Sequence, residues 1–226
     1  MQSSTRFEAF IDHTLLKADA TVADIRGLCL EAKKYGFYSV CVNPANVRLC
    51  KNILSGSGVK VCTVAGFPLG ASAAVTKAFE AKTAAKEGAD EIDMVINVGA
   101  LKSGRTGLVL DEIKLVRAAV PGKVLKVIIE AALLSRKEKI LACRLAKKAG
   151  ADLVKTSTGF ASGGASVPDV RLLRGAAGSR LGVKAAGGIR DAKTFLKMIK
   201  AGASRVGTSN SVSIMREIRG AKNECK

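Results

Sequence analysis

A glycine that follows a basic helical segment and precedes a short apolar strand recurs four times in this chain of 226 residues. Glycine suits the left-handed backbone position that ends a helix, and cations near that end interact favourably with the helix dipole. Successive copies are separated by about the length of two strand–helix units. Four copies therefore predict eight strands alternating with helices: Lys34-Tyr-Gly36, Lys86-Glu-Gly88, Lys148-Ala-Gly150 and Lys200-Ala-Gly202.

Regular alternation of strands and helices is typical of a parallel sheet, and eight repeats predict that the sheet closes on itself. Such barrels need at least about 200 residues, which this chain has. No stretch is typical of a linker. We therefore expect an α/β fold, a single (β/α)8 barrel over residues 1–226, with a short N-terminal helical extension.

The apolar runs give the expected strands, and helix-start signals follow several of them. Ser135 followed by Glu138 has the spacing of a capping box. Period-two alternation in the fourth strand points Asp93 and Asn97 into the barrel. The expected strands are Phe10–Thr14, Ser39–Val42, Val59–Ala65, Glu91–Ile96, Val124–Ile129, Ala151–Val154, Gly182–Ala185 and Arg205–Gly207.

The net charge of +18 raises the question of a nucleic-acid partner. The basic residues are scattered through helical segments, without clusters interleaved with aromatics, so we expect no nucleic-acid partner. A positive field also attracts phosphorylated small molecules. Six cysteines without a Cys-x-x-Cys pair, and His13 alone, predict no zinc site. The chain has no apolar run of about 20 residues and no leader-like start, so we expect a cytoplasmic protein without membrane contact.

The candidate nucleophile is Lys155, in Leu153-Val-Lys-Thr-Ser-Thr-Gly-Phe160 at the end of a buried strand. Burial disfavours a charged ammonium, and a neutral amine attacks carbonyl carbon. The alternative is an ordinary lysine that extends from the strand end to solvent.

Lys184, in Gly182-Val-Lys-Ala-Ala-Gly-Gly-Ile-Arg190, lies on the next predicted strand. Adjacent strands are about 4.8 Å apart. Two ammoniums about 6 Å apart repel by roughly 3 kcal/mol at an effective dielectric constant of about 20. We predict that this repulsion favours one neutral amine. Asp93 is then either a structural partner of an inward lysine or a general acid/base.

Two glycine-containing loops predict an anion site. They are Gly187-Gly-Ile-Arg190 and Gly207-Thr-Ser-Asn-Ser211, and each precedes a predicted helix. Backbone N–H groups at such positions bind phosphate, and barrels commonly build a phosphate site from the loops after strands seven and eight. Gly187, Gly188, Gly207, Ser209 and Asn210 are the expected contacts. Gly159 and the pair Gly163-Gly164 are expected to close a third side.

These motifs together resemble the deoxyribose-phosphate aldolase family, class I aldolases that form a Schiff base on a TIM barrel. The Lys-Thr-Ser-Thr-Gly and Lys-Ala-Ala-Gly-Gly motifs, in this order, are highly specific. The matching stretches are Ile11–Lys17, Ser39–Pro44, Glu91–Asn97, Lys126–Glu130, Val154–Gly159, Val183–Arg190 and Arg205–Ser209.

The resemblance implies reversible cleavage of 2-deoxy-D-ribose 5-phosphate to D-glyceraldehyde 3-phosphate and acetaldehyde, in deoxyribonucleoside catabolism. It assigns imine formation to Lys155, with Lys184 depressing the pKa of that amine and Asp93 acting as acid/base through a bound water. It also implies no metal or organic cofactor and a homodimer or homotetramer. Substrate contacts carried over by the resemblance are Asp12, near the sugar hydroxyls, Cys41, beside the substrate channel, and Thr156.

Two departures from the family pattern qualify the comparison. Asn210 stands where a second serine is common, and the tail Gly220–Lys226 lacks a tyrosine that some members use in proton exchange. The alternatives are another phosphosugar aldolase or isomerase on the same barrel, or a basic nucleic-acid-binding protein with a degenerate site.

Overall fold

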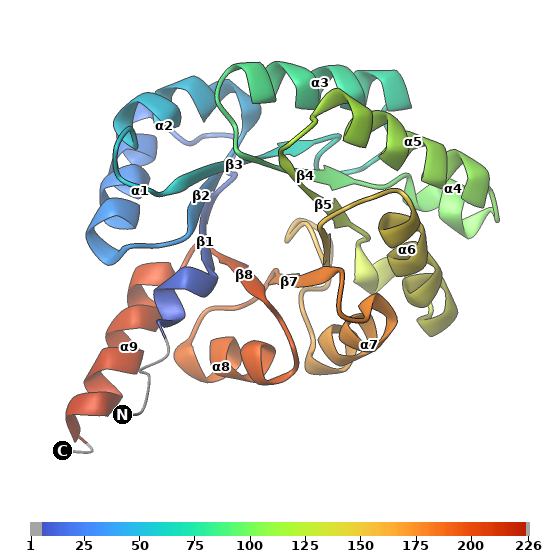
Figure 1. Cartoon of the computed structure of the whole chain (residues 1–226). Helices are drawn as coiled ribbons and strands as arrows, with labels where there is room; N and C mark the ends of the chain where they lie inside the picture. Colours follow the sequence, from blue (N-terminus) through green and yellow to red (C-terminus); the bar gives the residue numbers. More distant parts are fainter. Residues whose placement is uncertain (1–5, 225–226) are drawn as a thin grey trace.

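Eight parallel strands close into a barrel in chain order, and β8 pairs with β1. The computed structural model describes residues 6–224, so Cys225 and the end of the tail lie outside the described residues. Helices surround the barrel on all sides (Figure 1). The predicted (β/α)8 fold is confirmed, and the N-terminal helical extension is one 3-10 turn, η1 (Phe7–Phe10).

The eight strands lie within about two residues of the predicted bounds, because short apolar runs flanked by glycine define strands well. They are β1 (Ile11–Leu15), β2 (Ser39–Val42), β3 (Lys60–Ala65), β4 (Glu91–Val95), β5 (Val124–Ile128), β6 (Leu153–Lys155), β7 (Gly182–Ala186) and β8 (Arg205–Thr208). The α-helices are α1 (Val22–Tyr35), α2 (Val47–Ile53), α3 (Ala74–Lys86), α4 (Val98–Lys102), α5 (Thr106–Ala119), α6 (Arg136–Lys148), α7 (Val167–Ala177), α8 (Ala192–Lys200) and α9 (Ser211–Glu224). Two further 3-10 turns are η2 (Pro44–Asn46) and η3 (Ala131–Leu133).

The recurring glycines end helices as predicted. Gly36 follows α1 with φ 71°, and its N–H donates to the carbonyl of Ala32 at 3.0 Å. Gly88, Gly150 and Gly202 also have positive φ angles, of 110°, 80° and 107°. Only glycine adopts this conformation without strain, so each copy turns the chain from a helix into the next strand.

The expectation that Asn97 faces the barrel interior is wrong. β4 ends at Val95, and the Asn97 side chain accepts a hydrogen bond from the N–H of Ala100 at 2.9 Å. Asparagine is a favoured N-cap because its side-chain oxygen satisfies a free N–H of the first helical turn. This cap starts α4, a short helix that was not expected from the sequence.

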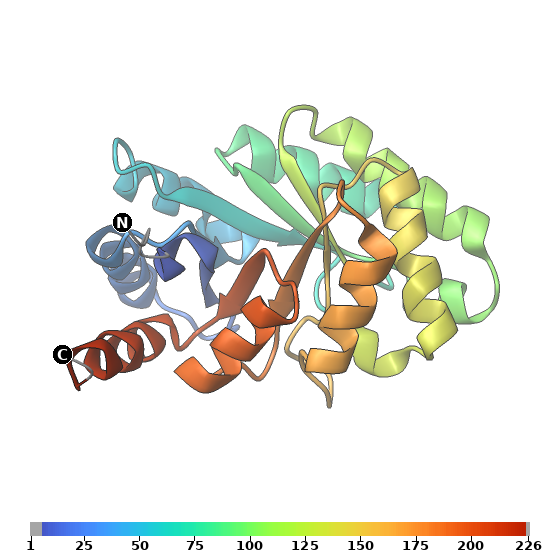
Figure 2. The ribbon, with the colours of Figure 1, turned by 60° about the horizontal axis from the view of Figure 1, so that its bottom comes forward.

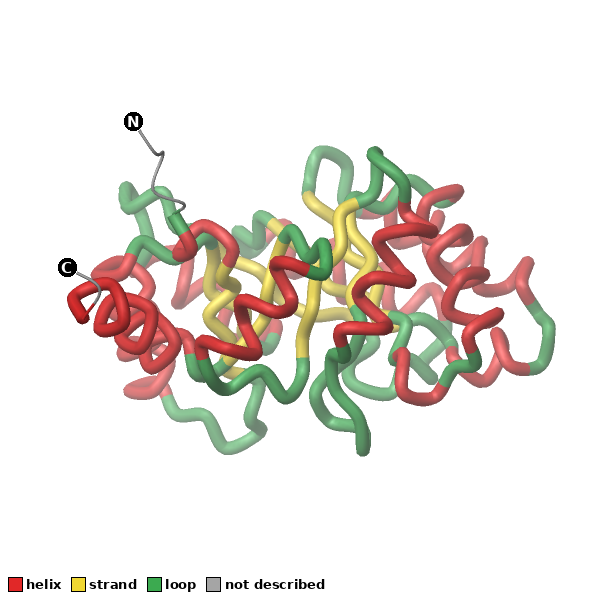
Figure 3. The backbone as a smooth tube through the Cα atoms, turned by 90° about the horizontal axis from the view of Figure 1, so that it is seen from below, coloured by secondary structure: helices red, strands yellow, loops and turns green. Residues whose placement is uncertain are grey.

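The apolar core lies between the strands and the surrounding helices. In Figures 2 and 3 the strands form the centre of the molecule and the helices cover their outer surface. A smaller apolar cluster of Leu16, Cys41, Cys62 and Val64 packs separately, with Phe67 against it. Most of the buried charged groups extend from the strands themselves. Within residues 6–224, the structure has no helix with both the length and the hydropathy of a membrane span.

Candidate active site

Asp93 is the centre of a buried ionic network inside the barrel. Its Oδ2 accepts hydrogen bonds from the ammoniums of Lys155 at 2.9 Å and Lys184 at 2.7 Å. Its Oδ1 accepts from Lys126 at 2.7 Å. Strand register explains the convergence, because Asp93 pairs with Lys126 across β4 and β5, and Lys155 pairs with Lys184 across β6 and β7. The structure therefore brings the two predicted lysines and the predicted carboxylate together.

Two further carboxylates and an arginine extend the network. Asp12 lies 2.5 Å from the Lys184 ammonium and 2.7 Å from the Arg205 guanidinium. Glu91 lies 2.6 Å from Lys126 and 3.1 Å from Arg205. Among the described residues, this network joins four cations and three carboxylates, leaving one surplus positive charge when all are ionised. Loss of one proton from an amine makes the network neutral, which a buried site favours.

The pKa shifts within the network have clear causes. Burial raises the pKa of Asp93, but Lys126, Lys155 and Lys184 outweigh it, and the pKa lies well below its usual range. Burial lowers the pKa of Lys184, but Asp12 and Asp93 outweigh it, and the pKa lies above its usual range. At neutral pH, Asp93 is therefore an anion and Lys184 a cation.

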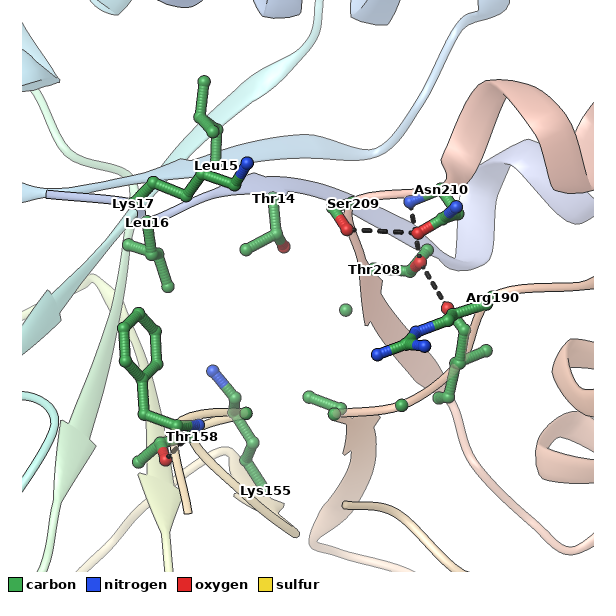
Figure 4. Close-up of a pocket in the computed structure, with 17 residues that line it drawn as sticks. Thr14, Leu15, Leu16, Lys17, Lys155, Thr158, Arg190, Thr208, Ser209 and Asn210 are labelled. Carbon is green, nitrogen blue, oxygen red and sulfur yellow. Dashed lines mark hydrogen bonds between the residues drawn. The ribbon is translucent and has the colours of Figure 1, made fainter. Parts of the chain in front are cut away.

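Lys155 is the member of this network that lines a cavity at the carboxyl ends of the strands. The cavity has a volume of about 290 Å³. Lys184 and Asp93 lie beneath it and are fully buried. Figure 4 shows the Lys155 amine pointing into the cavity, with Arg190 reaching in from the β7 loop. A substrate in this cavity thus meets the lysine amine first.

The glycine-containing loops form another wall of the same cavity. Six of the residues predicted to bind substrate line it: Gly159, Gly187, Gly188, Gly207, Ser209 and Asn210. Gly187 and Gly188 have φ angles of 91° and 75°, which glycine adopts without strain, and neither residue has a side chain to cover its backbone N–H group. The loops pack tightly, since a Cβ on Gly164 would lie 2.4 Å from the Gly187 carbonyl oxygen. Backbone N–H groups in such loops suit an anion.

Three other predicted substrate contacts lie away from the cavity wall. Asp12 is fully buried among the cations described above. Cys41 packs in the inner apolar cluster. The Thr156 hydroxyl accepts from the N–H of Ala186 and donates to its carbonyl, both at 3.1 Å, and so joins the ends of β6 and β7. These three side chains lie beneath the cavity and pack against the strands that carry the site.

Three charged residues of the site were not predicted from the sequence: Lys126, Glu91 and Arg205. A signal was available, because charged residues within short apolar strands need partners. The register that pairs Lys126 with Asp93 was the missing information. Two cations that line the cavity, Lys17 and Arg190, were also missed as contacts.

Glu130 positions the loop that follows Lys155. Among the described residues, Glu130 is the only one other than glycine that has a positive φ angle, 50°. Its carboxylate accepts the N–H of Thr158 at 3.2 Å and also bonds the Thr158 hydroxyl. The N–H of Ala131 donates to the Thr156 carbonyl at 2.8 Å. These bonds hold Thr158 and Gly159 at the edge of the cavity.

Two groups of side chains have metal-ligand chemistry: Cys41, Cys62 and Asp93, and the trio Asp12, Cys62 and Glu91, each with ligand atoms within 4.8 Å of one another. Lysine ammoniums already occupy the space between them. The Lys126 Nζ lies 3.2 Å from the Cys62 sulfur and 2.6 Å from Glu91. A metal ion would have to compete with this fixed positive charge.

The fold and the site define a barrel protein with a buried lysine amine facing a cavity lined by anion-binding loops, which is suited to chemistry on phosphorylated carbonyl compounds. A family model described as DeoC/LacD family aldolase matches residues 8–219. The chain is 57% identical to a deoxyribose-phosphate aldolase of Carboxydothermus hydrogenoformans over 220 residues, 96% of each protein. It is 60% identical to one of Geobacillus sp. over 206 residues, 91% of this chain and 92% of that protein.

A solved structure agrees with these sequence relatives. It is a tetrameric deoxyribose phosphate aldolase from Aeropyrum pernix, with a TM-score of 0.87 and 35% identity, covering 95% of this chain and 92% of that one. The chain belongs to the DeoC/LacD aldolase family.

Proposed function

We propose that this protein is a class I aldolase that reversibly cleaves 2-deoxy-D-ribose 5-phosphate to D-glyceraldehyde 3-phosphate and acetaldehyde. One observation carries the proposal. The Lys155 amine stands between a buried ionic network and a cavity lined by Gly187, Gly188 and Gly207. An amine and an anion site in one cavity suit a phosphorylated aldehyde. The similarity to deoxyribose-phosphate aldolases supports the choice of sugar.

The reaction begins when the neutral Lys155 amine adds to the C1 aldehyde carbon of the open-chain sugar. Loss of water gives a protonated imine. A base removes the proton of the C3 hydroxyl, the C2–C3 bond breaks, and its electron pair moves into the imine. D-glyceraldehyde 3-phosphate leaves, and an enamine remains on Lys155. Protonation of the enamine at C2 and hydrolysis of the imine release acetaldehyde and free the amine.

The ionic network explains why Lys155, rather than another lysine of the network, is the nucleophile. Lys184 and Lys126 share the Asp93 carboxylate with it, so Asp93 is not a dedicated counter-ion for a protonated Lys155. Lys184 stays cationic because the negative charges of Asp12 and Asp93 raise the pKa of its ammonium. A fixed cation beside Lys155 repels a second positive charge at that position. We assign Asp93 and Lys184 to the relay of protons between the amine and a water in the cavity.

The substrate phosphate fits the cavity wall formed by the loops after β7 and β8. The loops after β7 and β8 offer backbone N–H groups, and Arg190 adds a charged donor on the same side. Asn210 replaces a serine of the family pattern but still lines this wall, so we expect altered phosphate affinity rather than loss of binding.

Three further expectations from the sequence belong to this proposal. We propose that residues 1–226 work as one aldolase domain in the cytoplasm, and that the chain forms a homodimer or homotetramer. The tetrameric structure of the Aeropyrum pernix relative supports an assembly of this kind. Light scattering of the purified protein measures the oligomeric state directly.

The proposed activity is tested by turnover. Purified protein is mixed with 2-deoxy-D-ribose 5-phosphate, and D-glyceraldehyde 3-phosphate is followed through a coupled dehydrogenase. We expect turnover that EDTA does not inhibit, and none with Lys155→Met. The matched control is Lys139→Met. Lys139 lies on α6, outside the barrel, and we expect this variant to have normal turnover. Turnover of ketose phosphates alone would instead favour a different aldolase on this barrel.

A further inference from the structure

His13 connects three elements beside the phosphate loop, outside the ionic network. It lies in β1 and pairs in register with Thr208 of β8. Its side chain is 4% exposed. Its Nδ1 lies 2.9 Å from the hydroxyl of Ser211, and its Nε2 lies 2.8 Å from the carboxylate of Glu31 on α1.

Ser211 is the first residue of α9 and directly follows the segment Gly207–Asn210, which comprises the end of β8 and the two residues after it, lines the cavity and is called the Gly207–Asn210 loop below. The Ser211 side chain is fully buried, and its hydroxyl also lies 3.1 Å from the carbonyl oxygen of Thr208. Within the loop, the Asn210 N–H donates to the Thr208 hydroxyl at 3.0 Å. The contact between His13 and Ser211 therefore attaches the end of this loop to β1.

The number of hydrogens available sets the direction of these bonds. Burial lowers the pKa of His13, opposed by Glu31, so the ring is neutral at pH 7 and carries one hydrogen. The Glu31 carboxylate accepts and cannot donate, which assigns that hydrogen to Nε2. Nδ1 is then an acceptor, and the single hydrogen of the Ser211 hydroxyl lies between two acceptors, Nδ1 of His13 and the carbonyl oxygen of Thr208. Glu31 thus fixes the tautomer that lets His13 hold Ser211.

We propose that His13, acting through Ser211, is a positioning residue that holds the Gly207–Asn210 loop in the conformation that receives the substrate phosphate. The inference rests on the proposed function, because it assigns the loop to a phosphorylated substrate. It adds a residue that touches neither substrate nor reacting atoms. Its effect is confined to phosphate recognition, since the ring faces α1 and α9 rather than the network around Lys155.

Two substitutions separate this role from simple packing. In His13→Gln, the amide takes the place of Nε2 and keeps the bond to Glu31 but loses the contact to Ser211. In His13→Asn, the amide takes the place of Nδ1 and keeps the contact to Ser211. Two readouts are measured: the ratio of kcat/KM for 2-deoxyribose 5-phosphate to that for unphosphorylated 2-deoxyribose, and the binding of inorganic phosphate by NMR titration.

We expect both readouts to fall about tenfold in His13→Gln, the usual consequence of losing one buried hydrogen-bond partner. His13→Asn should restore them to within about threefold of the native protein. Ser211→Ala should reproduce the His13→Gln result, and the double variant should show no further fall. Phosphate titration needs no aldol turnover, so it tests the loop even if the native protein fails to cleave the sugar.

An equal fall in His13→Gln and His13→Asn would overturn the inference, because loss of ring packing alone would then explain both. So would a folded His13→Gln protein, judged by its thermal midpoint, with native phosphate affinity and a native substrate ratio.

Discussion

Replacement of Lys184 by methionine tests how the protein keeps the Lys155 amine reactive. Methionine has a similar length but no charge. The ammoniums of Lys155 and Lys184 both contact Oδ2 of Asp93, at 2.9 and 2.7 Å. They therefore lie less than about 6 Å apart, and at an effective dielectric constant of about 20 they repel by about 3 kcal/mol. Removing that repulsion also leaves Asp93 to pair more fully with Lys155.

This energy corresponds to about two pH units. We therefore expect the acidic limb of the pH profile of kcat/KM to move up by about two units in Lys184→Met. This charge effect should lower the rate about 100-fold at pH 7 and disappear as the pH rises, while the loss of Lys184 from the proton relay lowers the rate at every pH. The assay is the initial rate of 2-deoxyribose 5-phosphate cleavage between pH 5.5 and 10.

Lys77→Met is the matched control. Lys77 is also fully buried and ion-paired, with Glu112 at 2.7 Å, but it lies on α3 outside the barrel. It should lower the thermal midpoint without moving the limb. A Lys184→Met profile that falls equally at every pH, with its limb in the native position, would refute the charge-repulsion reasoning.

Three further variants or conditions probe the same network. Asp93→Asn should lower the thermal midpoint by about 10 °C in calorimetry, since removing one partner of a buried ion pair costs about 3–5 kcal/mol; a native midpoint would mean that the three lysines do not need the Asp93 carboxylate. Thr156→Val should lower the midpoint by roughly 3–10 °C through loss of its two bonds to Ala186; a large loss of kcat without this shift would assign its hydroxyl to the substrate instead. The depressed pKa values of Asp12 and Asp93 contribute stability that is present above the unfolded value near 4 and lost as the pH falls through the folded values. Urea midpoints should therefore fall steeply below about pH 4, and a flat profile there would contradict the ion pairing.

Sequence patterns were sufficient for the strands and for the lysine pair. Glycine at each helix end and alternation within the strands are local signals, and both depend directly on the backbone conformation. Adjacent placement of Lys155 and Lys184 followed from strand order alone, and the structure has them as register partners.

Side-chain partners could not be predicted in the same way, because they depend on register and depth. Asp12 resembled a residue near the sugar, but its position in β1 places it below the cavity, against Lys184 and Arg205. Lys126 could be placed only once β5 was aligned with β4. Asn97 showed a similar limit, since a strand end and a helix cap favour the same residue type.

The central claim is that a neutral amine on Lys155 forms the covalent intermediate. The most direct measurement is reduction with borohydride in the presence of acetaldehyde, followed by proteolysis and mass spectrometry. We predict a reduced two-carbon adduct on Lys155 and its loss in Lys155→Met. Adducts confined to exposed lysines such as Lys51 or Lys102, or an unmodified Lys155, would contradict it.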